Sequence, residues 1–217
     1  MTTLTEDERE ELSQSVRSAC ERLSSEERVR AVAYGERHGF RDESGVGSGF
    51  DATLWDALCN QVGVAAIALP EDHGGAGYGA SALGVVAHEL GRALAAVPFV
   101  GSTVLATGLL LDLTENDPDA EKRLTGLVEG RRTAAAALTG DGGLWGRSAI
   151  TLSANRSGGG WQVDGIVRHV LGGTAADDLV VVADIGGEPA VFLLDPLVDG
   201  VDVHAESVLD RTRPMPP

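Results

Sequence analysis

The chain has 217 residues, of which 43% are hydrophobic and only 4% aromatic. This length suits one large domain or two small ones, and the apolar content is enough to build a core. The 17 basic and 33 acidic side chains give a net charge of −16. Such a charge disfavours binding to nucleic acid and attachment to an anionic membrane surface.

The beginning of the chain is acidic and has no apolar signal core, and no run approaches the roughly 18 apolar residues of a membrane span. Cys20 and Cys59 do not have the spacing of metal ligands and are too few for a disulfide framework. We therefore expect a cytoplasmic protein that does not cross a membrane, has no metal site and keeps two reduced cysteines in its core.

Residues 1–130 carry apolar positions at helical spacing. Thr5 and Glu8 form a capping-box pattern, which predicts a first helix that runs to about Val32. The remaining helices are predicted to begin at Asp51, to begin at Ser81, to cover about Gly101–Leu111, and to begin at Asp117 or Asp119 and end near Glu129–Gly130.

The segment EDHGGAGYG (71–79) has four glycines in nine residues, so it is not predicted to be a helix. Its glycines would let backbone amides approach a phosphate, but the spacing is not G-x-G-x-x-G and no lysine follows as in a Walker loop. We favour a tight connection between helices, with His73 exposed to solvent.

His88, Glu89 and Arg92 lie together in the helix predicted from Ser81. A zinc-binding HExxH motif needs a second histidine where this chain has Arg92. We therefore expect an ion pair on the helix surface between Arg92 and either Glu89 or His88.

Residues 131–217 change to short β-branched or alternating runs, about a dozen residues apart, with glycine-rich turns and no helical pattern between them. This pattern predicts an antiparallel β-barrel or sandwich, and therefore an α+β protein with a helical bundle domain at 1–130 and a β domain at 131–217. The predicted strands are 133–138, 148–153, 161–167, 178–183, 190–195 and 201–207.

Two stretches of the sequence resemble the acyl-CoA dehydrogenase family. WDALCNQVGVAAIALPEDHGGAGYGASALGVVAHELGRALAAVPFVGSTVLA (55–106) is similar to the family's Leu-Pro-Glu-x-x-Gly-Gly-x-Gly segment and to its following Glu-Leu-Gly-Arg helix. GGGWQVDGIVRHVLGGTAADDLVVVA (158–183) is similar to its Gly-Trp and Gly-x-x-Ala-Asp segment. The resemblance runs from about residue 5 to the end of the chain.

This resemblance implies FAD as cofactor, an acyl-CoA thioester as substrate and an electron-transferring flavoprotein as electron acceptor. It assigns flavin contacts to Leu138, Thr139, His169 and Leu171. The family's Thr-Glu-Pro-x-x-Gly-Ser-Asp motif is replaced by Thr139–Gly146, where only the threonine is retained. His169 stands where many members have an aromatic residue, and Leu171 where a threonine or serine follows. Backbone groups are still able to bind the edge of the isoalloxazine ring.

By the same resemblance, the chain ends at DRTRPMPP within an incomplete β domain, and the family's C-terminal helical domain with its catalytic glutamate has no counterpart. No residue is therefore assigned as catalytic. Two functions stay open: a shortened dehydrogenase of fatty or steroid acyl-CoA, or a non-catalytic subunit of a full-length homologous dehydrogenase. Association into oligomers is expected, because five apolar side chains are predicted to lack part of their cover: Leu83, Val86, Leu90, Leu105 and Leu109.

Overall fold

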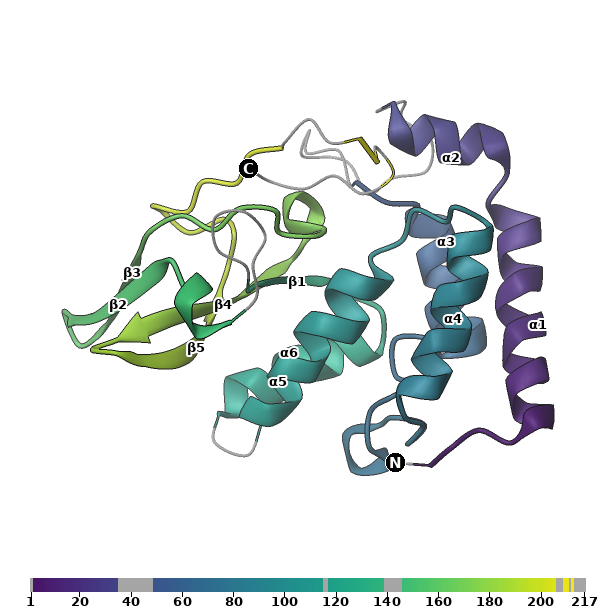
Figure 1. Ribbon diagram of the computed structural model, residues 1–217, viewed down its shortest axis with the longest axis horizontal. Coiled ribbons are helices and arrows are strands. Elements are labelled where there is room, and N and C mark those ends of the chain that lie inside the picture. Colours follow the sequence, from purple (N-terminus) through teal and green to yellow (C-terminus); the bar gives the residue numbers. More distant parts are fainter. Residues whose placement is uncertain are drawn as a thin grey trace.

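The computed structural model describes residues 2–34, 49–114, 117–138, 146–205, 209–210 and 212. The α-helices are α1 (Glu6–Leu23), α2 (Glu26–Ala33), α3 (Ala52–Ala57), α4 (Ala80–Arg92), α5 (Thr107–Leu113) and α6 (Pro118–Val128). The strands are β1 (Ala134–Ala137), β2 (Leu152–Ser157), β3 (Gly160–Asp164), β4 (Asp178–Ile185) and β5 (Glu188–Leu194). In Figure 1, α5 and α6 lie between α4 and the sheet. This arrangement confirms the predicted α+β class.

π-helices and 3-10 turns connect these elements. The π-helices are η1 (Leu58–Val62) and η3 (Phe99–Ala106), which continue α3 and precede α5 respectively. The 3-10 turns are η2 (Glu71–His73), η4 (Arg147–Ala149) and η5 (Gly173–Ala175). The helix predicted over 101–111 is therefore a π-helix for its first half and an α-helix for its second.

The first predicted helix is divided into two. The capping box is present, since the Glu8 amide donates to Thr5 Oγ1 over 3.3 Å and the Thr5 amide donates to Glu8 Oε2 over 2.8 Å. However, α1 ends at Leu23, and the Ser25 hydroxyl accepts a hydrogen bond from the Arg28 amide to cap α2. A serine that satisfies a free amide at a helix start favours a new helix over continuation of the old one.

Two further caps are confirmed. Asp51 Oδ1 accepts from the Leu54 amide over 3.0 Å at the start of α3, and Asp117 Oδ1 accepts from the Asp119 amide over 2.9 Å at the start of α6. Helix α4 begins at Ala80, one residue before the predicted Ser81.

The sheet is mixed, so the prediction of a purely antiparallel sheet is wrong. β4 pairs in parallel with β1, from Ala134 opposite Asp178 to Ala137 opposite Val181, and then in parallel with β2. Among the strands of the described ranges, the β2–β3 and β4–β5 pairs are antiparallel. The parallel pairs join strands that are distant in the sequence. The connection from β2 to β4 runs through β3 and the segment 165–177, which holds only the short turn η5, so no α-helix lies between these two parallel strands.

Two of the predicted strands also differ. Residues 147–149 form a 3-10 turn and β2 begins only at Leu152, so the strand expected over 148–153 is displaced. Residues 201–205 contain no strand, and the remainder of that predicted strand lies outside the described residues. Over the part of the chain that the structure describes, the strands form one five-stranded sheet rather than a closed barrel or a sandwich of two sheets.

An apolar core joins the helices to the sheet. Leu110 of α5 and Leu124 and Leu127 of α6 pack with Ala136 of β1 and Val180 of β4, and all five are buried. A second core lies among α1, α3 and α4, and a third on the other face of the sheet. None of the helices in the described ranges is both long enough and apolar enough to cross a membrane.

Candidate functional site

The glycine-rich loop after Pro70 is a tight connection, as predicted, because its backbone amides are already bonded. The Gly75 amide donates to the Pro70 carbonyl over 3.0 Å, and the Gly77 amide donates to the Leu69 carbonyl over 2.8 Å. The Gly77 carbonyl in turn accepts from the Thr2 amide over 2.8 Å. Amides that are used within the fold do not form a phosphate cradle.

His73 is not the solvent-exposed side chain that the sequence predicts. Its side chain is 24% exposed, and its Nδ1 lies 3.4 Å from Glu121 Oε2. The histidine therefore sits between the loop and α6, and the prediction failed because α6 is 45 or more residues further along the chain.

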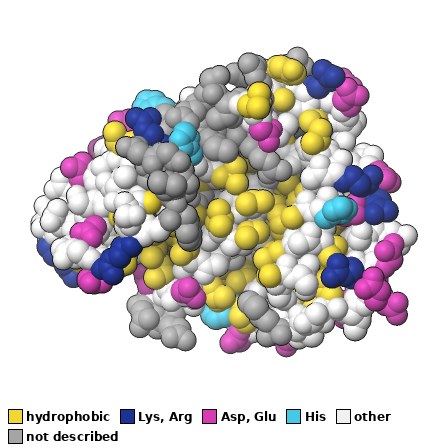
Figure 2. Space-filling view, viewed as in Figure 1, with side chains coloured by type: hydrophobic (Ala, Val, Ile, Leu, Met, Phe, Trp, Pro, Cys, Tyr) yellow, Lys and Arg dark blue, Asp and Glu magenta, His cyan; other side chains and the backbone are white. Residues whose placement is uncertain are grey.

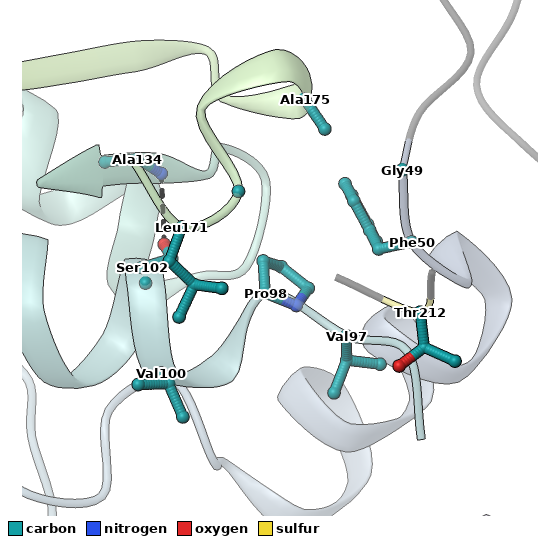
Figure 3. Close-up of a pocket in the computed structure, with 12 residues that line it drawn as sticks. Gly49, Phe50, Val97, Pro98, Val100, Ser102, Ala134, Leu171, Ala175 and Thr212 are labelled. Carbon is teal, nitrogen blue, oxygen red and sulfur yellow. Dashed lines mark hydrogen bonds between the residues drawn. The ribbon is translucent and has the colours of Figure 1, made fainter. Parts of the chain in front are cut away.

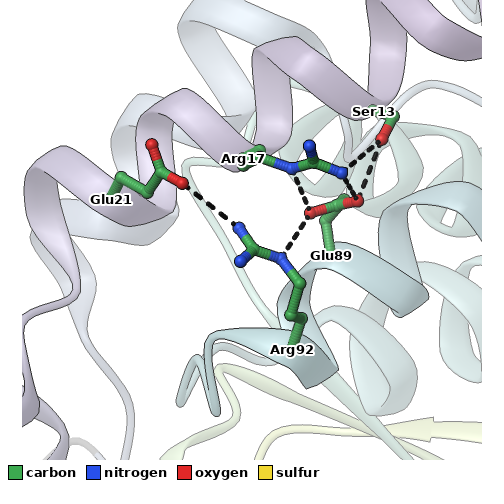
Figure 4. Close-up of polar contacts among 5 residues, drawn as sticks. All are labelled: Ser13, Arg17, Glu21, Glu89 and Arg92. Atoms are coloured by element: carbon green, nitrogen blue, oxygen red, sulfur yellow. Dashed lines mark hydrogen bonds and ion pairs between the residues drawn. The ribbon is translucent and has the colours of Figure 1, made fainter.

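Glu89 is the centre of a polar cluster that joins α1 to α4 (Figure 4). Its carboxylate accepts from Arg17 over 2.8 and 3.1 Å, from Ser13 over 2.9 Å and from Arg92 over 3.0 Å. Arg92 also reaches Glu21 of α1 at 3.4 Å. These charged hydrogen bonds, led by those from Arg17, lower the pKa of Glu89 to about 2, although burial acts in the opposite direction.

The predicted Glu89–Arg92 ion pair is present, but its position on the helix surface was wrong, because the Glu89 side chain is only 1% exposed. Glu89 follows Ala82 and Val86 on the buried face of α4, so helical spacing alone was enough to indicate burial. All acceptor groups of this carboxylate face arginine and serine donors, which makes the cluster a structural tie between helices.

A second buried carboxylate, Asp178, lies where the helices meet the sheet. It is fully buried and forms ion pairs with Arg123 of α6 and with Arg132, the latter at 2.8 Å. The neighbouring Asp177 accepts from the Thr133 amide over 2.7 Å. These contacts fix the beginnings of β1 and β4 against α6.

Beside this joint lies a small hollow between η3, the start of β1 and the segment that precedes β4 (Figure 3). Its volume is about 30 Å³, room for about two water molecules and far less than the space of a typical ligand pocket. The described residues that line it have no titratable side chain: Gly49, Phe50, Val97, Pro98, Val100, Gly101, Ser102, Ala134, Leu171, Gly172, Ala175 and Thr212.

The four residues assigned to the flavin have different environments. Leu171 lies at the hollow, and His169 is exposed with a left-handed backbone of φ 58°. Leu138 follows β1 and packs partly into the core between helices and sheet. Thr139 lies outside the described residues. The structure thus brings Leu171 to the junction of helices and sheet, and it places Leu138 beyond the opposite end of β1 from Ala134.

The segment around His169 is irregular and leads into Leu171 and Gly172 at the hollow. Residues 166–170 form no strand, and two of their carbonyls are bonded locally, that of Ile166 to the Thr151 hydroxyl and that of Val170 to the Gly173 amide. Val170 is 6% exposed and anchors the segment in the core, while Gly172 is left-handed with open space where a side chain would point. An anchored, irregular backbone next to open space suits hydrogen bonding by N–H and C=O groups to a flat ring.

Sequence reasoning overlooked Gly101 and Ser102, which lie in η3 and line the same hollow. The available signal was a glycine and a serine together in an otherwise apolar run after Pro98. Such small residues mark a place where another part of the backbone approaches closely.

Apolar side chains gather in the middle of the face shown in Figure 2, over η3 and α5. Leu105 of η3 and Leu109 of α5 are partly exposed, as expected, and so is Leu83 of α4. The expectation was wrong for Val86 and Leu90, which are 0% and 3% exposed because α1 packs along that face of α4.

The cysteines are both buried free thiols, in agreement with the sequence prediction. Over the described ranges, histidine, cysteine and acidic side chains form no group that is able to hold a metal ion.

The residues of interest for function are those at the junction of η3, β1 and the 166–172 segment.

Comparison with known proteins gives the family of the chain. The family model for the acyl-CoA dehydrogenase N-terminal domain matches residues 6–130. Acyl-CoA dehydrogenase IpdE2 of Mycobacterium tuberculosis is 35% identical over 152 residues, which are 70% of this chain and 43% of that protein. The chain spans about half the length of the relatives and structures that it matches.

Two solved structures resemble nearly the whole chain. A variant of the Tcur3481–Tcur3483 steroid ACAD has a TM-score of 0.77 at 30% identity and covers 97% of this chain and 54% of its own. The ChsE4–ChsE5 complex from Mycobacterium tuberculosis has a TM-score of 0.78 at 28% identity and covers 99% of this chain and 54% of its own. The sequence match over more than half of the chain, together with these folds, shows that the chain belongs to the acyl-CoA dehydrogenase family.

Proposed function

We propose that the chain supplies the helical and β parts of a flavoprotein that dehydrogenates an acyl-CoA thioester between its α and β carbons. The observation that supports this most is the packing of the Leu171 segment against η3, because it sets the predicted flavin-binding backbone beside the apolar wall of Val97 and Val100. When bound, FAD supplies the acceptor for the hydride from the β carbon.

Within this proposal the chain's own residues bind and orient rather than transfer protons. The backbone of residues 168–172 holds the ring edge, and the exposed His169 lies beside it. Val97 and Val100 give an apolar wall without charge. Since the described lining residues include no titratable group, the base that removes the α proton has to come from outside that set.

A second candidate is a subunit that binds but does not catalyse, in partnership with a full-length homologous dehydrogenase. The names of the two similar structures favour it, since Tcur3481–Tcur3483 and ChsE4–ChsE5 each combine two different polypeptides. The partly exposed Leu105 and Leu109 are suited to contact with such a partner. For both candidate functions, the proposed electron acceptor is an electron-transferring flavoprotein.

Steroid acyl thioesters are the proposed first substrates to test, because one of the most similar structures is a steroid ACAD. Fatty acyl thioesters of several lengths form the comparison set. A hollow of about 30 Å³ does not select among them by itself.

The test is co-expression with a full-length acyl-CoA dehydrogenase encoded beside this chain in its genome. FAD content after gel filtration and reduction of an artificial electron acceptor by acyl-CoA are measured for the chain alone, the partner alone and the mixture. We expect the chain alone to hold little FAD and to show no turnover, and the complex to gain both. Stoichiometric FAD and turnover in the chain alone would exclude the hypothesis of a non-catalytic subunit. No FAD and no turnover in any sample would contradict the proposed function.

A further inference from the structure

Gly101 of η3 faces the backbone of Leu171, at the point where the helices meet the 166–172 segment. A Cβ atom at position 101 would lie 2.6 Å from the Leu171 carbonyl oxygen and 3.4 Å from its carbonyl carbon. A rotamer change does not relieve this contact, because the obstacle is main chain rather than the tip of a side chain.

The next residue of η3 holds the neighbouring strand. Ser102 is 2% exposed, and its hydroxyl oxygen accepts from the Ala134 amide over 3.0 Å. The hydroxyl of Thr133, the residue before β1, donates to the Ala175 carbonyl of η5 over 3.1 Å. This bond ties the start of β1 to the turn that follows the 166–172 segment. Two successive residues of one helical turn therefore meet both β1 and the Leu171 backbone.

Other helical glycines do not have this role. Gly84 of α4 and Gly108 of α5 have no atom within 4 Å of where a Cβ would stand. Gly101 is buried in η3 and makes a main-chain contact. Its hydrogen atom is therefore required by the approach of Leu171 rather than by the helix itself.

We propose that Gly101 is a positioning residue that sets how closely the Leu171 backbone lies to η3. Through that backbone it sets the position of the segment 166–172, which is proposed to bind the edge of the flavin ring. This inference rests on the proposed function for the identity of the ligand, but the contact itself does not. An added methyl group has to move the Leu171 carbonyl from 2.6 Å to an ordinary contact of at least 3.4 Å, a displacement of about 0.8 Å. In enzyme sites a displacement near 1 Å costs up to about 100-fold in function.

The experiment compares Gly101→Ala with the matched control Gly108→Ala, both in the chain together with its partner subunit. The first readout is amide hydrogen exchange over residues 166–173, and the second is the flavin absorption envelope with the dissociation constant for FAD. We expect Gly101→Ala to speed exchange about tenfold or more, to alter the flavin envelope and to weaken FAD binding by about 10- to 100-fold. Gly108→Ala should match the wild type in all three.

Exchange and flavin properties that are equal in the two variants would overturn the inference. If the wild-type complex holds no FAD, the proposed function fails, and the exchange measurement still decides the role of Gly101. If Gly101→Ala does not fold, Leu171→Gly in the otherwise wild-type chain loosens the same backbone from the other side of the contact and should speed exchange over residues 166–173 and alter the flavin envelope. Wild-type exchange and an unchanged envelope in that variant would overturn the inference.

Discussion

The buried carboxylates Glu89 and Asp178 each bind two arginines, but they join different parts of the molecule. Glu89 ties α4 to α1 within the helical part, and one of its partners, Arg92, lies on its own helix. Asp178 ties β4 to α6 and to the residues before β1, so it crosses between helices and sheet.

The two carboxylates should therefore affect different properties: Glu89 the stability of the helical part, and Asp178 also the position of the candidate site. Loss of the Glu89 tie should loosen two helices and leave the hollow intact. Loss of the Asp178 tie should move the starts of β1 and β4, which carry the hollow and the Leu171 segment. Removing one partner from a buried ion pair costs about 3 to 5 kcal/mol, because the charges that remain are buried without compensation.

The largest effect is expected from Asp178→Ala. The change leaves Arg123 and Arg132 without their shared carboxylate and should lower the free energy of unfolding by about 4 kcal/mol. Urea unfolding measures this loss. The control is Asp184→Ala on the same strand, where the carboxylate caps only the amide of exposed Gly187. An equal loss in the two variants would show that the buried ion pairs of Asp178 contribute no more than an exposed cap.

Glu89→Gln should cost somewhat less, about 3 kcal/mol at neutral pH, because the amide keeps part of the hydrogen bonding. The pKa of Glu89 falls from an ordinary 4.5 to about 2 on folding, so its contribution is complete above pH 4.5 and declines as the pH falls toward 2. The difference in unfolding free energy between wild type and Glu89→Gln should therefore shrink over that range.

The control for this pH dependence is Glu21→Gln. Glu21 also pairs with Arg92, but its side chain is 66% exposed, and exposed pairs contribute less than about 1 kcal/mol. A difference between wild type and Glu89→Gln that stays constant from pH 6 to pH 3 would show that Glu89 is not the charged centre of the cluster.

Ser102→Ala should have a smaller effect, about 1 to 2 kcal/mol, because it leaves the buried Ala134 amide without its acceptor. Thermal or urea unfolding detects it. The exposed serine of β2, Ser153, gives a matched control in which Ser153→Ala should be nearly neutral. If both variants behave alike, the Ser102 hydroxyl does not hold β1.

The smallest structural effect is expected at the cysteines, whose role is packing. Burial raises the pKa of Cys20 to about 11 and that of Cys59 to about 12. At pH 8 the native protein should therefore be alkylated about 100-fold more slowly than the urea-unfolded chain, as followed by mass spectrometry. Rapid labelling of the native protein at either thiol would contradict its position in the core.

The sequence was sufficient for features that depend on neighbouring residues. Thr5, Asp51 and Asp117 each cap a helix because a side-chain oxygen meets an amide two or three residues ahead. The glycine-rich loop likewise closes on its own backbone between Leu69 and Gly77. Local spacing determines both kinds of feature.

Features that depend on distant partners were not predicted. The parallel pairing of β1 with β4 and the Arg17–Glu89 pair both join residues far apart in the chain, and the latter are 72 positions apart. Leu171 was assigned to the flavin by resemblance, but its contact with Gly101 depends on how η3 packs against the sheet. Only the assembled fold reveals such a contact.

The central claim is that the irregular segment 166–172 lies against the flavin, and one measurement tests it most directly. The absorption envelope of the FAD-loaded complex is compared among the wild type, His169→Ala and Leu171→Ala. We expect His169→Ala to alter the envelope, because its side chain is proposed to lie beside the ring, and Leu171→Ala to alter it little, because that residue is proposed to act through its backbone. An envelope that neither change affects would contradict the placement of the flavin on this segment.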